Sequence, residues 1–221
     1  MERRSISQDY YILAVNDDGH MPVMRAKDCN AGLVIAGLLD LLGAGVITME
    51  KKKKITVEGE LPQDFAYLEP LYTYLQKKPR FVEKVMSDYI VTMSSRMKDL
   101  TVSIGEALDS QHKAEKDKGG LFGSVTLFIP DKTYKNNLIN SFKAEVLQQG
   151  EISLADAALV SLLKETGNLN QYFSKYERDD LKTRLKDLKK EPQNKQISDM
   201  INYVDTVIAA SMTALMVSTH S

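Results

Sequence analysis

Residue types that commonly carry catalysis are few in this chain and stand far apart. Its three histidines, His20, His112 and His220, belong to no metal-binding spacing such as His-Glu-x-x-His. The single cysteine, Cys29, has no partner for a disulfide, which is typical of a protein in a reducing cytoplasm. The glycine-rich stretches match neither a phosphate-binding loop nor a dinucleotide fingerprint. The sequence therefore predicts a non-enzymatic, cytoplasmic protein with no metal ion and no cofactor.

Basic residues offer a different chemistry, the binding of anionic groups. The densest cluster is a run of four lysines: Lys51, Lys52, Lys53 and Lys54. A lysine close to an anionic membrane leaflet contributes about 1 kcal/mol of attraction. The alternative is a solvated turn between two strands, in which the lysines only keep the chain soluble. The residues alone leave both interpretations open.

The charge of the whole chain is close to balanced. Lys and Arg total 29 and Asp and Glu total 30, which gives a formal net charge of −1. Nonspecific nucleic-acid binding usually shows as a strongly basic chain, so an electrostatic function must come from a local patch. The most apolar late stretch, residues 204–217, is polar at several positions and shorter than the roughly 20 apolar residues that span a bilayer. Contact with a membrane is therefore expected to be peripheral.

The elements that must position these residues are mainly helical. Residues 30–45, NAGLVIAGLLDLLGAG, are apolar on nearly every face, which is typical of a buried central helix. Asn30 is its predicted N-cap, and Gly43 and Gly45 are its predicted stop. Apolar spacing predicts further helices at 68–78, at 81–108 (in one piece or broken near residues 87–88), at 138–150, 153–167, 181–188 and 197–216.

Short alternating segments predict β-structure. Ile47 and Met49 precede the four lysines, and Ile55 and Val57 follow them, which predicts a β-hairpin. A second hairpin is predicted at 107–129.

Two local details complete this picture. Within the second hairpin, residues 110–120 have the composition of a loop, and residues 10–15 are predicted to form a strand that ends in the turn 16–19. The chain is 43% hydrophobic and can bury a sizeable core. The predicted fold class is mainly α: a single globular helical domain, residues 1–221, around a buried central helix and decorated with two β-hairpins.

Three stretches, in this order, resemble the Golgi phosphoprotein 3 family. They are GLVIAGLLDLLGAGVITME at 32–50, FAYLEPLYTYLQKK at 65–78 and ALVSLLKETGNLNQYFSKYERDDLKTRLKDLKK at 158–190. The resemblance covers roughly residues 8–215, and the short loops of this chain look like those of a bacterial member. It implies a mainly helical single domain with β-hairpins, in agreement with the reading of the residues.

The resemblance also implies a function. Eukaryotic members of the family are peripheral membrane proteins that bind phosphatidylinositol 4-phosphate through a basic pocket beside an exposed aromatic residue, and that recruit glycosyltransferases. The family's tryptophan corresponds to Arg25 here, and one arginine of its pocket corresponds to Val34. For this chain the resemblance implies a lipid-headgroup site built from Arg25, Lys27 and Arg96, with the four lysines tuning the affinity for an anionic surface.

The leading hypothesis is therefore a peripheral protein, possessing no catalytic site, whose partner is an anionic membrane surface or a phosphorylated headgroup. One alternative is a protein-interaction adaptor that forms a homo-oligomer through the hairpin at 107–129. Another is a nucleic-acid-binding regulator in which the lysine hairpin acts as the wing of a winged helix. The helix before this wing is apolar and does not suit a DNA groove, which argues against nucleic acid as a partner.

Overall fold

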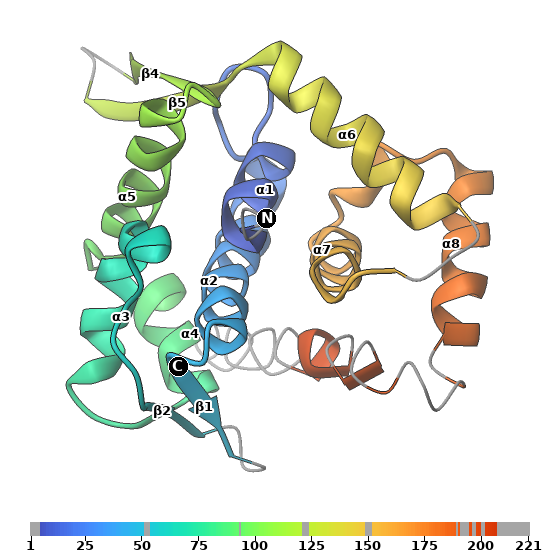
Figure 1. Ribbon diagram of the computed structural model, residues 1–221. Helices are drawn as coiled ribbons and strands as arrows, with labels where there is room; N and C mark the ends of the chain where they lie inside the picture. Colours follow the sequence, from blue (N-terminus) through green and yellow to red (C-terminus); the bar gives the residue numbers. More distant parts are fainter. Residues whose placement is uncertain are drawn as a thin grey trace.

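A long apolar helix, α2 (Ala26–Gly43), runs through the middle of the computed structural model (Figure 1). Every residue from Ala31 to Leu41 is buried. A helix that is apolar on all sides needs neighbours on all sides, and α2 contacts α1 (Ile6–Ala14) as well as α7 (Leu154–Glu165). The predicted buried central helix is confirmed, although it begins four residues before the predicted Asn30 cap.

The structure describes residues 5–50, 54–92, 94–120, 124–148, 152–188, 190, 195, 198–199 and 202–206. Three of the four lysines, Lys51, Lys52 and Lys53, lie outside these residues. Lys54 is described and begins strand β2. Most of the last predicted helix, 197–216, also lies outside the described residues, and its described part, 198–199 and 202–206, is helical.

The first element corrects the sequence-based prediction of a strand at 10–15. Residues 10–14 form the second half of α1 and Val15 is its C-cap, and every side chain of α1 is buried, chiefly against α2 and α7. A short apolar run that is buried on every side has no clear period, so strand and helix look alike in the sequence. Ser5 favours the helix over a strand, because its Oγ accepts a hydrogen bond from the backbone N–H of Gln8 and caps the helix.

Two groups of helices flank the central pair, α1 and α2, as Figure 1 shows. On one side lie α3 (Glu69–Gln76), α4 (Val82–Met86) and α5 (Arg96–Ser110), and on the other α6 (Lys132–Leu147), α7 and α8 (Lys175–Leu188). The break predicted near residues 87–88 is present as a π-helical turn, η3 (Ser87–Val91), between α4 and α5. Short 3-10 turns complete the connections: η1 (Val23–Arg25), η2 (Gln63–Leu68) and η5 (Leu169–Gln171).

Two small antiparallel sheets decorate the helices. In the first, β1 (Ile47–Met49) pairs with β2 (Lys54–Val57), so the lysine hairpin is confirmed, and β3 (Arg80–Phe81) adds an unpredicted third strand. In the second, β4 (Ala114–Gly119) pairs with β5 (Val125–Pro130). The predicted loop at 110–120 is therefore wrong. Most of this stretch is strand β4, whose charged side chains face water. A stretch so rich in charged residues resembles a loop in the sequence.

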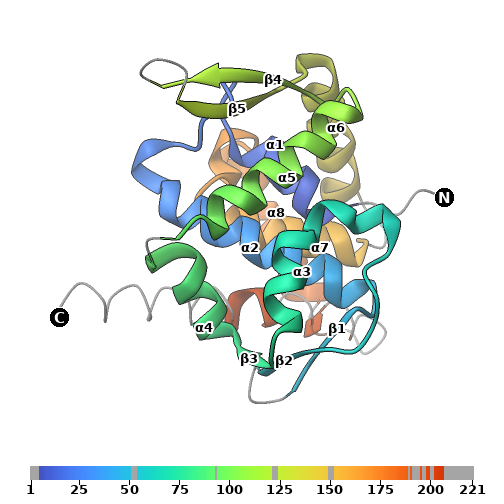
Figure 2. The same cartoon turned by 90° about the vertical axis from the view of Figure 1, so that its left-hand side faces the viewer.

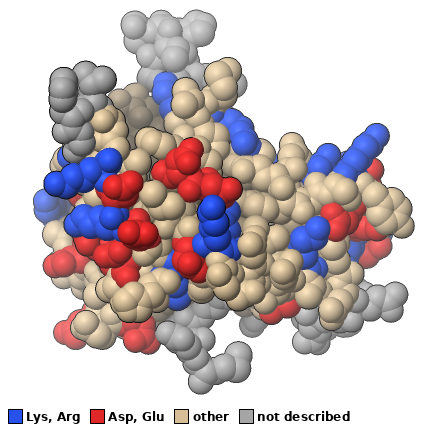
Figure 3. Space-filling model, turned by 90° about the horizontal axis from the view of Figure 1, so that it is seen from above, with Lys and Arg blue, Asp and Glu red and all other residues tan. Residues whose placement is uncertain are grey.

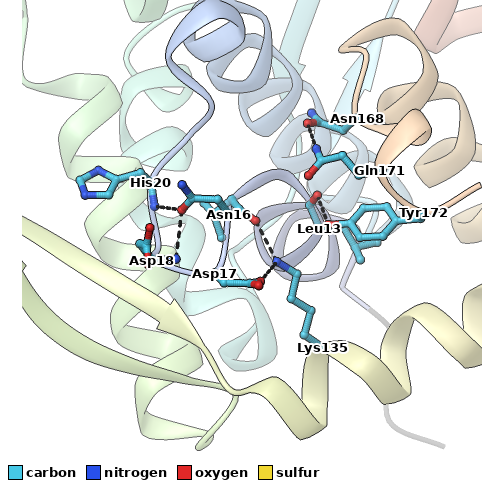
Figure 4. Close-up of polar contacts among 10 residues, drawn as sticks. Leu13, Asn16, Asp17, Asp18, His20, Lys135, Asn168, Gln171 and Tyr172 are labelled. Atoms are coloured by element: carbon cyan, nitrogen blue, oxygen red, sulfur yellow. Dashed lines mark hydrogen bonds and ion pairs between the residues drawn. The ribbon is translucent and has the colours of Figure 1, made fainter.

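The turn that follows α1 is held by side chains from distant segments (Figure 4). Asn16 Oδ1 accepts hydrogen bonds from the backbone N–H groups of Asp18 and His20, which confirms the predicted turn. The Lys135 ammonium, on α6, donates to the carbonyl of Val15 at 3.0 Å and to Asp17 Oδ1 at 3.1 Å.

A second side chain holds the same end of the helix. The Tyr172 hydroxyl donates to the Leu13 carbonyl at 2.7 Å. The end of α1 is thus fixed to both α6 and the segment after α7. Among the helices that the structure describes, none combines the length and the hydropathy needed to cross a bilayer.

Candidate functional site

Two adjacent apolar side chains stand out in solvent just before the central helix. Val23 is 89% exposed and Met24 is 94% exposed, both in the 3-10 turn η1. We call these two residues the apolar tip. The turn follows Pro22, whose carbonyl accepts a hydrogen bond from the Arg25 N–H at 2.9 Å, and this bond folds the tip outward from the start of α2. Adjacent exposed apolar groups mark interaction surfaces more often than exposed single side chains do.

Arg25, next to the tip, donates a hydrogen bond to the backbone at the end of another helix. Its Nη1 donates to the carbonyl of Gly167, and the carbonyl of Thr166 lies 3.5 Å away. These carbonyls follow the C-terminus of α7, where the helix dipole favours a cation. Gly167 has φ +70°, and a Cβ there would lie 3.0 Å from Arg25 Nη1. Arg25 therefore anchors the tip to α7.

A buried polar network continues this anchor into the core. The Tyr10 hydroxyl donates to the Cys29 carbonyl at 3.2 Å and to Thr166 Oγ1 at 3.1 Å. Asn168 Nδ2 donates to Thr166 Oγ1 at 3.1 Å and to Cys29 Sγ at 3.2 Å. Burial raises the pKa of the Cys29 thiol, so it stays protonated and serves as a hydrogen-bond acceptor. The network joins α1, α2 and the end of α7 beneath the tip.

Arg96 begins α5 and lies over the ring of Tyr74. Its guanidinium carbon is 5.4 Å from the ring centroid, and that of Arg80 is 4.0 Å from the same ring. The Tyr74 hydroxyl donates to Asp88 Oδ2 at 2.8 Å, and Lys84 binds the other carboxylate oxygen at 2.8 Å. Burial acts to raise the pKa of Asp88, but the hydrogen bonds from Lys84 and Tyr74 outweigh it and lower that pKa. The arginines are thus held in a fixed arrangement around one tyrosine.

A pocket of about 390 Å³ opens beside this arrangement and is lined by Arg96, Lys77 and Tyr74, together with Asp99 and Glu69. Neither Arg25 nor Lys27 lines it. Lys27 is exposed on the first turn of α2. In Figure 2 the first turns of α2 and α5 lie on the same side of the molecule. The joining of Arg25, Lys27 and Arg96 in one headgroup site stays a prediction.

Charge elsewhere on the surface is mixed. Figure 3 shows the face above β4, β5 and α6, where Lys and Arg side chains are interspersed with Asp and Glu. The described part of that face carries no broad area of one sign. We take the side of the molecule that bears the apolar tip, Lys27 and the start of α5 as the candidate surface, because the tip is exposed there.

Several of these features escaped the sequence analysis. The exposure of Val23 and Met24 was not predicted, although Pro22 followed by two apolar residues before a helix is a signal that could have indicated it. Arg80 and Tyr74 were also missed as partners of Arg96, since their meeting depends on how α3, β3 and α5 pack.

These observations define a mainly helical protein with two small sheets and an exposed apolar tip that is followed by two basic residues, Arg25 and Lys27. The family model of Golgi phosphoprotein 3 (GPP34) matches residues 6–204, which is most of the chain. The chain belongs to the Golgi phosphoprotein 3 family, as the resemblance of its three stretches had indicated. A search of curated proteins finds no match to this chain.

Proposed function

We propose that this protein is a non-enzymatic, cytoplasmic protein that docks peripherally on anionic membranes and recognises phosphoinositide-like headgroups. Membership in the Golgi phosphoprotein 3 family suggests phosphoinositide binding in general terms. The observation that carries the proposal is the apolar tip, because Val23 and Met24 are almost fully exposed. Proteins that lie on membranes insert such side chains at the boundary between headgroups and acyl chains, beside lysines and arginines that face the phosphates.

Each part of the surface has a distinct role in this proposal. The tip enters the interface, Lys27 and Arg96 attract headgroups, and Arg25 holds the tip in place while adding its charge. Lys51–Lys54 strengthen the attraction without deciding which headgroup is recognised. Fully burying one Val or Met side chain is worth about 1.5–3 kcal/mol, and each lysine near an anionic leaflet adds about 1 kcal/mol. Such sums give reversible binding, as an adaptor requires.

The first prediction tests the tip by vesicle co-sedimentation. Replacing both tip residues (Val23→Ser with Met24→Ser) should weaken binding to anionic vesicles at least about tenfold, because the variant loses the apolar area that enters the interface. Wild-type binding should rise with the anionic lipid fraction. If the wild-type protein binds neither neutral nor anionic vesicles, the proposal is wrong.

Two exposed residues elsewhere provide matched controls. Tyr176 on α8 is 76% exposed and Val125 on β5 is 45% exposed. Replacing Tyr176 by Ser should leave vesicle binding unchanged. Val125→Ser should also leave vesicle binding unchanged, and a loss of binding in this variant would place the membrane contact on the β4–β5 hairpin instead of the tip.

The second candidate function is a protein-interaction adaptor that forms a homo-oligomer through this hairpin. The observation in its favour is that β4 and β5 form a two-stranded sheet, so each strand keeps one edge unpaired within that sheet. Unpaired edges can accept a strand from another chain. The charged residues Glu115–Lys118 on β4 work against such pairing, which is why we rank this candidate second.

A further inference from the structure

Two apolar side chains besides the tip are exposed in the segment between α3 and α5. Phe81 on β3 is 50% exposed, and Val91 at the end of η3 is 37% exposed. Among the described residues seven large hydrophobic side chains are exposed, and four of them are these two and the two tip residues. Single exposed apolar residues are common, whereas a group of them on one surface marks a place of interaction.

The segments that carry these four side chains follow one another in space. The turn η1 leads directly into α2, α2 contacts η3, and α4 contacts both η3 and β3. In Figure 2 they run from the chain before α2 down past α4 to β3, along the left and lower part of the molecule. Phe81 and Val91 therefore continue the apolar tip along one flank of the protein.

The pairing of β3 explains why Phe81 points to solvent. Successive residues of a strand point to opposite faces of a sheet. The guanidinium carbon of Arg80 lies 4.0 Å from the centroid of the Tyr74 ring, so Arg80 takes the inner face and Phe81 the outer one. Lys54 pairs with Phe81 across the sheet and shares this outer face. Glu50, whose backbone N–H donates to the Lys54 carbonyl, offsets the charge of that lysine.

The chain around Phe81 is basic. Residues 77–84, KKPRFVEK, hold four basic residues and one acidic residue. Lys84 forms an ion pair with Asp88 at 2.8 Å, whereas Lys77 and Lys78 are exposed and form no ion pair among the described residues. An exposed apolar ring beside a surplus of positive charge suits an anionic leaflet, whose phosphates attract the lysines and whose boundary region accepts the ring.

We infer that the membrane contact extends from the apolar tip across η3 to β3, and that Val91 and Phe81 enter the same anionic leaflet as the tip. The inference rests on the proposed membrane docking and adds the orientation in which the molecule docks. Lys77 and Lys78 face the headgroups beside Phe81. Apolar contacts spread along a flank hold the protein in one orientation, whereas the tip alone would leave it free to tilt.

Single tryptophans test this orientation, because the chain contains no tryptophan of its own. Phe81→Trp, Val91→Trp and, for the tip, Met24→Trp are mixed with phosphatidylcholine vesicles that contain anionic phosphatidylglycerol. We expect the emission of all three to move to shorter wavelength and to be quenched by lipids brominated in their acyl chains. Tyr176→Trp on α8 is the control and should respond to neither, because its side chain stays in water. Circular dichroism of each variant confirms that it is folded.

The outcomes separate this inference from the proposed function. If Met24→Trp responds to vesicles and Phe81→Trp or Val91→Trp does not, the extended contact is wrong and the docking of the tip stands. If the wild-type protein binds no vesicles, both are wrong. A response of Tyr176→Trp equal to the others would overturn the orientation. Short-wavelength emission of Phe81→Trp before vesicles are added would show that protein covers this position, and would overturn the inference as well.

Phe81→Ser measures what the ring contributes to binding. Its affinity for anionic vesicles should fall at least about threefold, because the exposed half of the ring no longer leaves water. Tyr176→Ser removes an exposed aromatic ring elsewhere and should leave the affinity unchanged. Equal affinity of Phe81→Ser and the wild-type protein contradicts the inference.

Discussion

At the scale of single residues, Asp40 shows how a helix can be capped from another helix. Its carboxylate, on α2, accepts hydrogen bonds from the backbone N–H groups of Ile6 and Ser7 at 2.9 Å and from Ser7 Oγ at 2.5 Å. These groups belong to the first turn of α1, whose dipole favours a negative charge. Burial nevertheless dominates and raises the pKa of Asp40 to about 6.

This raised pKa predicts a specific pH dependence of stability. Because the folded pKa of about 6 lies above the ordinary value of 3.8, the contribution of Asp40 is fully present below about pH 4 and is lost as the pH rises through 6. Two pKa units correspond to roughly 3 kcal/mol in the free energy of unfolding. Denaturant unfolding at several pH values should show this decline in the wild-type protein and not in Asp40→Asn. Parallel pH profiles for the two proteins would contradict the assignment.

Arg25 illustrates what the sequence can and cannot tell about one residue. Its position before the central helix and beside Lys27 could be read directly, and so could its charge. Its contact with the Gly167 carbonyl could not, because the partner lies far along the chain and belongs to a turn whose place depends on the packing of α7. The same holds for Arg96, whose neighbour Tyr74 comes from a different helix.

At the scale of elements, the link between η1 and the end of α7 gives a further prediction. Gly167→Ala should disturb Arg25, because the added Cβ would lie 3.0 Å from its Nη1 and 3.2 Å from its Cδ. We expect faster amide hydrogen exchange at residues 23–27 and weaker vesicle binding, although no tip residue is changed. The exchange measurement needs no membrane, so it tests the anchor separately from the proposed docking.

Gly45→Ala is the matched control. Gly45 has φ +72°, close to the +70° of Gly167, but a Cβ there would meet nothing within 4 Å. Both variants should lose about 1–2 kcal/mol from the left-handed backbone conformation. Only Gly167→Ala should alter exchange at the tip, and equal effects in both variants would show that Arg25 does not position it.

Elements differed in how well the sequence predicted them. The central helix, the lysine hairpin and the helix predicted at 153–167 carry strong local signals, and all three are present. The strand predicted at 10–15 is helix, since complete burial removes the polar face that would reveal its period. Strand β4 was read as a loop because its side chains are solvated in a two-stranded sheet.

At the scale of the whole molecule, a net charge of −1 offers no general attraction to an anionic membrane. Any salt dependence of binding must then come from the local basic residues. Raising the salt from about 0.05 to about 0.5 M shortens the screening length and should weaken binding to anionic vesicles. Changing Lys51–Lys54 to Gln should lower the affinity at low salt and flatten this dependence, without altering the preference among headgroups. Binding insensitive to both changes would remove the electrostatic part of the proposal.

The clamp at the end of α1 has a consequence for the order of folding. The carbonyls of Leu13 and Val15 are bound by Tyr172 and Lys135, which follow more than a hundred residues later in the chain. Contacts between such distant residues form late, because a long loop must close first. During synthesis α1 therefore leaves the ribosome before Lys135 and Tyr172, the two residues that secure its end, have been made.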